Sequence, residues 1–200
     1  MTESIKDYSV QDIHIKDEYK DYLHRPLFDV NMRLYKSCNP YKAIVNRAIK
    51  YMIEMFDKKF HDYSEIQGVS GANLGIPFNI IAIRGTKDYS LMVMVNPEIL
   101  SQRGKSKTVR SNCGSLMLDE PIEIVRRTKL CVKYHGVTLK GKNNRSVRIL
   151  LSKTTQWFKD SEAFTIQHEV DHNNGITILD RAKDPFQLKS THRGFYQTHP

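Results

Sequence analysis

Apolar side chains recur at helical spacing in one long segment of the first half of the chain. Over residues 41–56 they return every three or four positions, as in a helix that buries one face. Asn39 can cap the first turn and Pro40 suits the first helical position, so the pattern predicts a helix that ends near Phe60. Residues 1–38 lack periodicity and are expected to form an irregular arm.

The middle of the chain carries shorter apolar runs that are typical of β-strands. Glycine, proline and asparagine separate these runs and favour turns, with a glycine-rich loop at 68–77 and a turn at 143–144. A second helix is expected over about 161–173. The order of helix, strands and helix predicts an α+β fold with a mostly antiparallel sheet. The expected strands are residues 80–83, 91–97, 122–125, 129–141 and 146–151.

The composition is that of one soluble domain. The 200 residues are 40% apolar and 26% charged, no apolar run is long enough for a membrane helix, and the N-terminus lacks the apolar core of a secretory signal. Three cysteines are an odd number, which fits a reducing compartment and favours a cysteine that is a ligand or nucleophile over a disulfide. We therefore expect an intracellular protein with no membrane partner.

Positive charge is concentrated after the first 40 residues. The net charge is +9, and residues 1–40 contain six Lys or Arg and seven Asp or Glu, so the rest of the chain carries the whole excess. Such a surface attracts polyanions such as ribosomal RNA through their phosphates, without sequence-specific recognition of nucleic acid. A role in solubility alone is the simpler explanation.

The segment TIQHEVDHNNG, residues 165–175, lies on the second predicted helix and contains two histidines four residues apart. His168 and His172 share one helical face, so both imidazoles can bind the same metal ion. Glu169 points about 100° around the helix, where it suits a general base better than a ligand. The alternative is that both histidines are ordinary core or surface residues.

The third ligand decides which class of metal enzyme this helix would belong to. Ile178 occupies the position where one protease pattern needs a third histidine, and no glutamate follows Glu169 as another protease pattern needs. Cys113 lies upstream among small residues, and one cysteine with two histidines leaves an open coordination position for catalysis. Cys38 and Cys131 are better explained as small, partly buried side chains.

Three motifs make the chain resemble the peptide deformylase family from about residue 40 to about residue 182. They are GVSGANLGIP, SNCGS and QHEVDHNNG, in the family's order and near its spacing, and ILDRA after the last motif also matches. The resemblance implies antiparallel β-sheets packed around a central metal-binding helix, with a helix near the N-terminus. It divides the chain into an irregular arm over 1–38, a catalytic domain over 39–182 and a tail over 183–200.

The resemblance also implies a site and a reaction. Cys113, His168 and His172 would bind one divalent metal ion, ferrous iron in cells with zinc or nickel as alternatives, and Glu169 would be the catalytic acid and base. The substrate would be the N-formyl group on the first methionine of a nascent chain, released as formate. The expected location is the cytoplasm of a bacterium or of a virus-infected bacterium, or an organelle.

Two residues of the implied site depart from the family pattern. Asn73 stands where the family has a glutamine that donates to the oxygen of the tetrahedral intermediate, and Gly114, whose N–H serves the same oxygen, replaces a bulky apolar residue. Gly68, Val69 and Phe164 are the predicted substrate contacts. Because Asn is one methylene shorter than Gln, two alternatives stay open: a deformylase-like protein with weak or no activity that binds modified N-termini or ribosomes, and an RNA-associated protein with a structural metal.

Overall fold

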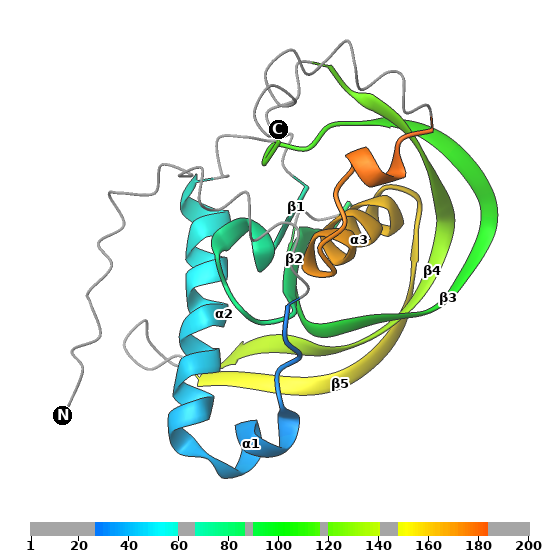
Figure 1. Ribbon diagram of the computed structural model, residues 1–200. Coiled ribbons are helices and arrows are strands. Elements are labelled where there is room, and N and C mark those ends of the chain that lie inside the picture. Colours follow the sequence, from blue (N-terminus) through cyan, green and yellow to red (C-terminus); the bar gives the residue numbers. More distant parts are fainter. Residues whose placement is uncertain (1–26, 60–66, 87–89, 117–119, 141–147, 184–200) are drawn as a thin grey trace.

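The structure is a computed structural model that describes residues 27–59, 67–86, 90–116, 120–140 and 148–183 (Figure 1). The expected turn at 143–144, the arm as far as residue 26 and the tail after residue 183 lie outside these segments. Among the helices that the structure describes, none is long and apolar enough to cross a membrane.

Helix α2, Asn39–Lys59, forms where the helical spacing predicted it. Its apolar face packs against the sheet, in a core cluster that includes Ile80 and Val95. Burial of apolar side chains at this spacing is what stabilises a helix of this kind in water. The fully buried side chains of α2 are Val45, Ile49, Met52 and Phe56.

A short helix, α1 Met32–Ser37, corrects the prediction of an irregular arm as far as residue 38. Its first turn is capped by Asn31, whose side-chain oxygen accepts hydrogen bonds from the N–H groups of Arg33 and Leu34, both at 3.1 Å. Six residues are too few for apolar periodicity to register, so the cap was the only available signal.

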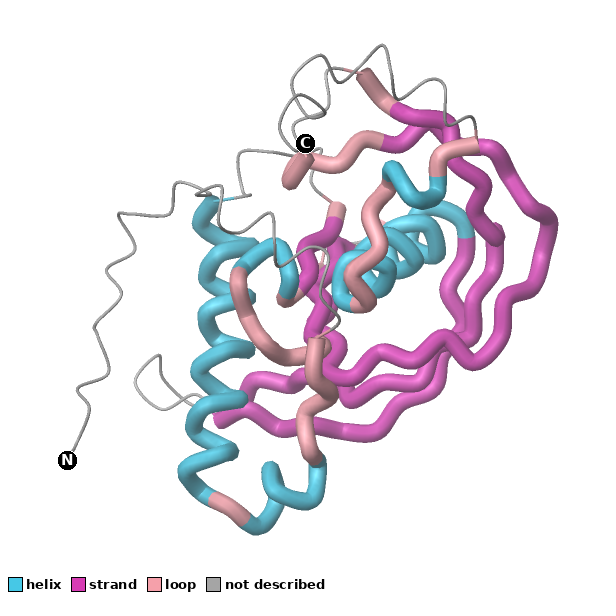
Figure 2. The backbone as a smooth tube through the Cα atoms, in the orientation of Figure 1, coloured by secondary structure: helices cyan, strands magenta, loops and turns pink. Residues whose placement is uncertain are grey.

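Within the described segments, five strands pair antiparallel in one sheet with the order β1-β2-β3-β4-β5, and Figure 2 shows the strands in magenta. The α+β class and the antiparallel pairing are confirmed. The strands are β1 Gly68–Ser70, β2 Ile80–Arg84, β3 Leu91–Ser111, β4 Ile122–Lys140 and β5 Arg148–Lys159.

Three strands are longer than the apolar pattern predicted. β3 continues through the mostly polar run after residue 97, β4 joins the segments predicted at 122–125 and 129–141, and β5 continues past the predicted end at 151 to Lys159. The segment predicted as a loop at 68–77 begins with the short strand β1. The part of β3 after residue 97 has polar side chains on both faces, so its sequence does not show the alternation of apolar and polar residues that predicts a strand. The register between β3 and β4 shifts at three places, and such bulges bend strands. The bent strands curve around the last helix (Figure 1).

The last helix, α3 Asp160–Asn173, lies inside the curve of the sheet and occupies the centre of the fold (Figure 1). Ala163 and Ile166 bury its apolar side against Leu130 and Phe158 of the long strands. Unlike α2, it also buries polar side chains, and buried polar groups need partners. These residues are Gln167, Glu169, Asp171, His172 and Asn173.

Candidate metal centre

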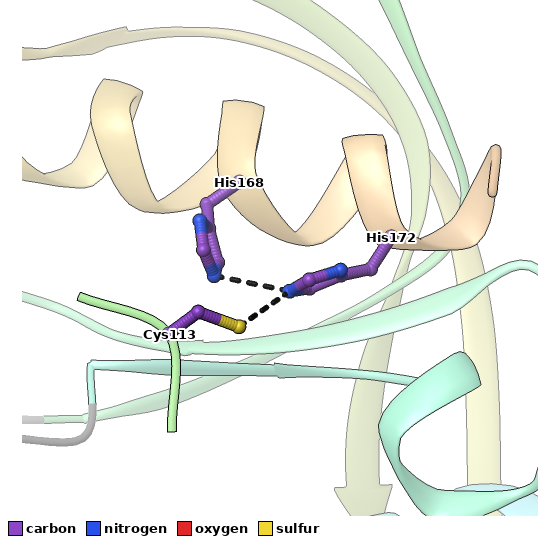
Figure 3. Close-up of side chains that lie close together, drawn as sticks. All are labelled: Cys113, His168 and His172. Carbon is purple, nitrogen blue, oxygen red and sulfur yellow. Dashed lines mark hydrogen bonds between the residues drawn. The ribbon is translucent and has the colours of Figure 1, made fainter. Parts of the chain in front are cut away.

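Three side chains from two distant parts of the sequence converge beside α3 (Figure 3). The Nε2 atoms of His168 and His172 are 3.1 Å apart, and the Cys113 sulfur lies 3.4 Å from His172 Nε2. All three possible ligand atoms lie within 4.8 Å of one another. The predicted imidazoles and thiol are therefore brought together, close enough to share one ion.

Helix α3 positions the two histidines, and its other polar side chains hold the helix against the sheet. Gln167 bonds the backbone of Arg127 in β4 twice: its Nε2 donates to the carbonyl at 3.0 Å, and its Oε1 accepts from the N–H at 3.2 Å. At the end of the helix, Asn173 Nδ2 donates to the Ile80 carbonyl of β2 at 3.1 Å. These contacts fix the rotation of α3, and hence the direction in which its histidine face points.

A buried carboxylate beside the histidines is held between two arginines. Asp171 accepts hydrogen bonds from Arg126 of β4 and, at 2.8 Å, from Nη2 of Arg181. Arg181 belongs to the short 3₁₀ helix η4, Leu179–Arg181, so the pair ties the segment after α3 back to the helix. Loss of one partner from such a pair leaves a charge buried without compensation.

The cysteine lies in a short turn just after β3. The Cys113 N–H donates to Asn112 Oδ1 at 2.8 Å, and the Leu116 N–H donates to the Cys113 carbonyl at 3.1 Å. The Cys113 side chain is buried among apolar residues that include Ile122 and Ile178. Ile178, which fills the place of a third histidine in the protease pattern, therefore forms part of the apolar surroundings of the thiol.

Burial keeps all three candidate ligands uncharged in the absence of an ion. It lowers the pKa of His168 to about 3 and the pKa of His172 to about 4. The positive charge of Arg126 further disfavours protonation of both imidazoles. Burial also raises the pKa of the Cys113 thiol to about 11. Both imidazoles are therefore neutral, as metal ligands must be, whereas the thiol has to lose a proton.

The donor set fits a divalent transition metal. Imidazole nitrogen and thiolate sulfur suit zinc, ferrous iron, nickel and cobalt. Within the described segments, Glu169 Oε2 is a buried side-chain atom without a hydrogen-bond partner. This carboxyl group is thus not satisfied by the protein alone, which is the condition expected beside a site built for a ligand.

Glu169 lies against β1 at the same site. A Cβ on Gly68 would come within 2.8 Å of Glu169 Oε1 and 2.6 Å of Thr165 Cγ2, so glycine is needed for β1 to approach α3 this closely. Burial raises the pKa of Glu169 to about 8, and the charge of Arg126 opposes the shift. A carboxyl group that exchanges its proton near neutral pH suits acid–base catalysis.

A sequence model of one family, polypeptide deformylase, matches residues 26–187. The chain belongs to the polypeptide deformylase family. The match begins inside the predicted irregular arm and includes α1. The peptide deformylases of Oceanobacillus iheyensis and Halalkalibacterium halodurans are 29% and 27% identical to it over 158 residues each, which cover 74% and 73% of this chain and 79% and 80% of theirs.

Solved structures of peptide deformylases share this fold. The enzyme from Plasmodium falciparum superposes with a TM-score of 0.59 at 19% identity, with 84% of each chain covered. The enzyme from Synechococcus elongatus, in complex with actinonin, also gives a TM-score of 0.59, at 20% identity, with 85% of this chain and 78% of the other covered. These likenesses confirm the fold class.

Of the two site residues expected to depart from the deformylase pattern, Gly114 lies in the turn that carries Cys113 and Asn73 contacts this turn from the 3₁₀ helix η3, Ala72–Leu74. Asn73 donates from Nδ2 to Ser115 Oγ at 2.5 Å. Gly114 is exposed, and a Cβ built on it would meet no atom within 4 Å. The absent side chain of Gly114 therefore leaves open space beside the deformylase centre.

The predicted substrate contacts lie in different surroundings. Gly68 is packed against Glu169. Val69 is buried in the core cluster under α2, so its side chain serves the core. Phe164 is half-buried on α3, one turn before His168. Of these three residues, Gly68 is therefore the one whose surroundings tie it directly to the centre.

Several polar residues that support the candidate metal centre were not assigned a role from the sequence, among them Gln167, Ser115 and Arg126. Gln167 and Ser115 belong to the matched motifs QHEVDHNNG and SNCGS, so their place in a motif was a usable signal. Arg126 is 4% exposed although it falls between two predicted strands, where a charged residue suggests a solvated turn. Its burial follows from β4 being continuous through this point.

Proposed function

We propose that this chain is a metal-dependent peptide deformylase in which Cys113, His168 and His172 hold one divalent ion. The enzyme removes the N-formyl group from the initiator methionine of nascent polypeptides and releases formate. The family match over residues 26–187 supports the activity. The observation that carries the assignment of residues is the convergence of the three donors beside the buried carboxyl group of Glu169.

Glu169 is the proposed acid and base of the reaction. Cys113, His168 and His172 would hold the divalent ion, which would supply Lewis-acid chemistry for the formyl carbonyl and the attacking water. Glu169 takes the proton of the attacking water and then gives it to the leaving nitrogen. A pKa raised to about 8 by burial lets one carboxyl group perform both transfers near neutral pH.

Gly114 is the proposed donor to the oxygen of the tetrahedral intermediate. Its backbone N–H follows Cys113 directly, at an exposed position with free space beside it. A missing donor of this kind costs about 10² to 10³ in rate. The direct donor role of Asn73 stays a prediction, because its Nδ2 already uses one hydrogen on Ser115.

The substrate contacts are also proposed from position. Gly68 and Val69 in β1 would offer backbone groups to the peptide, since a peptide that reaches Glu169 must pass close to Gly68. The half-buried Phe164 would contribute an apolar surface to the methionine side chain.

Ferrous iron is the ion proposed for the protein in cells, with zinc or nickel as alternatives. One thiolate and two imidazoles suit all three metals, so metal availability decides which is bound. The measurement is the metal content of protein prepared without oxygen. A preparation that holds none of the three metals would contradict this assignment.

The long strands carry a separate proposal about partners. β3, β4 and β5 together contain twelve Lys or Arg and two Glu, and all of these cations except the buried Arg126 are exposed or half-buried. A surface of this charge favours contact with ribosomal RNA in the cytoplasm, through phosphates rather than base sequence. We expect the protein to sediment with ribosomes at low salt and to be released as salt rises. Failure to sediment at low salt would contradict the contact.

The central experiment compares formate release by the wild type and Glu169→Ala. Protein is prepared without oxygen, metal content is measured, and formate release from formyl-Met-Ala-Ser is followed. Glu54→Ala is a matched control, because Glu54 is exposed on α2. We expect Glu169→Ala to retain metal and lose about 10² to 10⁴ in rate, the usual contribution of a general acid–base group.

The opposite result has a clear meaning. A wild-type protein that binds metal but shows no Glu169-dependent formate release would contradict the enzymatic proposal. It would favour the alternative of a deformylase-like protein that only binds modified N-termini or ribosomes.

A further inference from the structure

A hydrogen-bonded chain of side chains leads from β1 to the turn that carries Cys113. Asn73 Nδ2 donates to Ser115 Oγ at 2.5 Å. Ser115 lies two residues after Cys113, inside the turn closed by the hydrogen bond from Leu116 to the Cys113 carbonyl. One polar contact therefore joins the glycine-rich segment to the cysteine turn, 42 residues further along the chain.

The orientation of the Asn73 carboxamide is fixed by its other end. Asn73 Oδ1 accepts hydrogen bonds from the Ser70 N–H at 2.9 Å and from Ser70 Oγ at 2.5 Å, and Ser70 is fully buried. A backbone N–H can only donate, so a carboxamide turned by 180° would set two donors against each other. Asn73 must therefore present its NH₂ group to Ser115.

This orientation decides what the Ser115 hydroxyl does. An NH₂ group can only donate, so Ser115 Oγ is the acceptor in that contact, and its own hydrogen is left for another acceptor. Ser115 lies two residues after Cys113 in the same closed turn, so its contact with Asn73 holds the part of the turn that carries the thiol. The donors thus run in one direction, from Ser70 through Asn73 to Ser115.

We propose that Ser115 is a positioning residue for Cys113 and that Asn73 acts on the metal centre through Ser115. The inference rests on the proposed function, because it takes Cys113 to be a metal ligand. It gives Asn73 a task other than the direct contact with the reacting oxygen that is expected at its position. The Asn73 side chain ends at the turn and holds the turn of Cys113 in place.

The expected size of the effect follows from what such contacts do elsewhere. Outer-shell residues that orient metal ligands usually contribute about 10-fold to 100-fold to metal affinity or activity. Ser115→Ala should therefore raise the Kd for Zn²⁺ or Co²⁺ by at least about 10-fold. It should lower kcat more than it changes KM, because the ligand and not the peptide-binding surface is disturbed.

The test measures metal binding apart from activity. The Kd for Zn²⁺ is obtained by competition with a chromophoric chelator, and the sulfur-to-metal charge-transfer band is recorded in the Co²⁺ form. Ser152→Ala is the matched control, because Ser152 is exposed on β5 and far from the centre in the sheet. We expect Ser115→Ala to weaken binding and shift the band, and Ser115→Thr, which keeps a hydroxyl group, to resemble the wild type.

A double-mutant cycle tests whether Asn73 acts through Ser115. If it does, Asn73→Ala weakens metal binding, and the double variant is no weaker than Ser115→Ala alone. Additive losses would overturn the inference. Asn73→Gln separates the two roles further: weaker metal binding is expected here, whereas a higher kcat with unchanged metal binding would show a direct donor and overturn the inference.

Two further outcomes keep the failures distinguishable. A wild-type Co²⁺ form with no sulfur-to-metal band would overturn the assignment of Cys113 as a ligand, and the inference with it. The other outcome is a normal band in the wild type that Ser115→Ala leaves unchanged, with a metal Kd for Ser115→Ala equal to that of the Ser152→Ala control. This outcome would overturn only the inference. Thermal unfolding of each variant identifies any that fail to fold. If Ser115→Ala fails to fold, Asn73→Ala and Ser115→Thr still test the proposal.

Discussion

The two halves of the metal centre are held in different ways. The histidine half lies within one helix, and the side chains on either side of it bond β4, η4 and β2 through Gln167, Asp171 and Asn173. The cysteine half lies in a turn after β3, where Asn112 and the Asn73–Ser115 contact supply the described side-chain hydrogen bonds. Two ligands therefore inherit their geometry from a helical repeat, and the third depends on the conformation of a turn.

Because of this difference, the positions of the histidines are fixed, whereas the position of the thiol can change. The spacing of the histidines cannot drift while α3 stays helical, because residues four apart always share a face. The position of the thiol can drift with any change in the turn or in the residues that touch it. Departures from the family pattern at Asn73 and Gly114 fall on this second half.

Removal of the thiol should have the largest effect. We expect Cys113→Ala to lower metal affinity and formate release by more than about 10²-fold, because loss of a partner that merely supports a ligand already costs up to this much. Cys131→Ala is the matched control, since Cys131 is half-buried in β4 away from the centre. Full metal occupancy in Cys113→Ala would contradict the ligand assignment. Metal content and formate release are the measurements.

Breaking the anchor of the histidine half should mainly reduce stability. Asp171→Asn removes the charge that faces Arg126 and Arg181, and loss of one partner from a buried pair costs about 3 to 5 kcal/mol. The exposed pair of Glu98 with Lys133 is the control, and Glu98→Gln should cost no more than about 1 kcal/mol. Urea unfolding measures both. Equal losses would show that the anchor is not special.

Crowding β1 against the helix should cost less. Gly68→Ala places a methyl group within 2.8 Å of Glu169 Oε1, and overpacking of this kind costs about 1 to 3 kcal/mol. Gly136→Ala is the control, because its nearest contact would be 3.4 Å away. We expect a lower kcat and a lower melting temperature for Gly68→Ala. An unchanged kcat would show that β1 can move away without disturbing the carboxyl group.

The pH dependence of metal binding should come from groups other than the histidines. Around pH 6 the imidazoles are already neutral and the thiol is still protonated, so binding releases a proton from Cys113. Glu169, whose pKa is raised to about 8, is a second source of a proton when a positive ion binds, and Glu169→Ala removes it. In this variant, metal affinity should rise about tenfold for each unit of pH around pH 6. Calorimetry in buffers of different ionisation enthalpy measures the proton count, and release of two protons by Glu169→Ala would contradict the neutral state of the histidines.

The smallest effect is expected at Gly114. Gly114 has no positive φ, and a Cβ there meets no neighbour within 4 Å. Gly114→Ala should therefore add about 0.4 to 1 kcal/mol to the free energy of unfolding, by restricting the unfolded chain, and should leave kcat unchanged. A large loss of activity with normal metal content would show that the space beside the N–H is needed for the substrate.

The features that follow from regular helical spacing could be predicted from the sequence, and those that depend on contacts between distant segments could not. Helix α2 and the histidine pair follow from spacing, and Cys113 was reached by excluding other third ligands. The bent part of β3 was missed because residues 102–111 are polar on both faces and owe their strand conformation to pairing with β4. Helix α1 was missed because it is too short to show a period.

The polar support of the site could not be predicted for a related reason. Whether Arg126 is buried beside Asp171 or exposed depends on where β4 lies relative to α3, and no local pattern contains that information. The orientation of Asn73 likewise depends on Ser70 and Ser115, which meet only in the folded chain.

The junction between β5 and α3 has a consequence for how this chain can change over evolution. β5 ends at Lys159 and α3 begins at the next residue, Asp160, whose φ of 48° turns the chain within one position. A helix advances about 100° per residue, so one residue inserted or deleted here would swing His168 and His172 a quarter turn or more away from Cys113. The length of this junction therefore sets the angular phase of the metal site, and the left-handed conformation of Asp160 narrows the residues that can replace it.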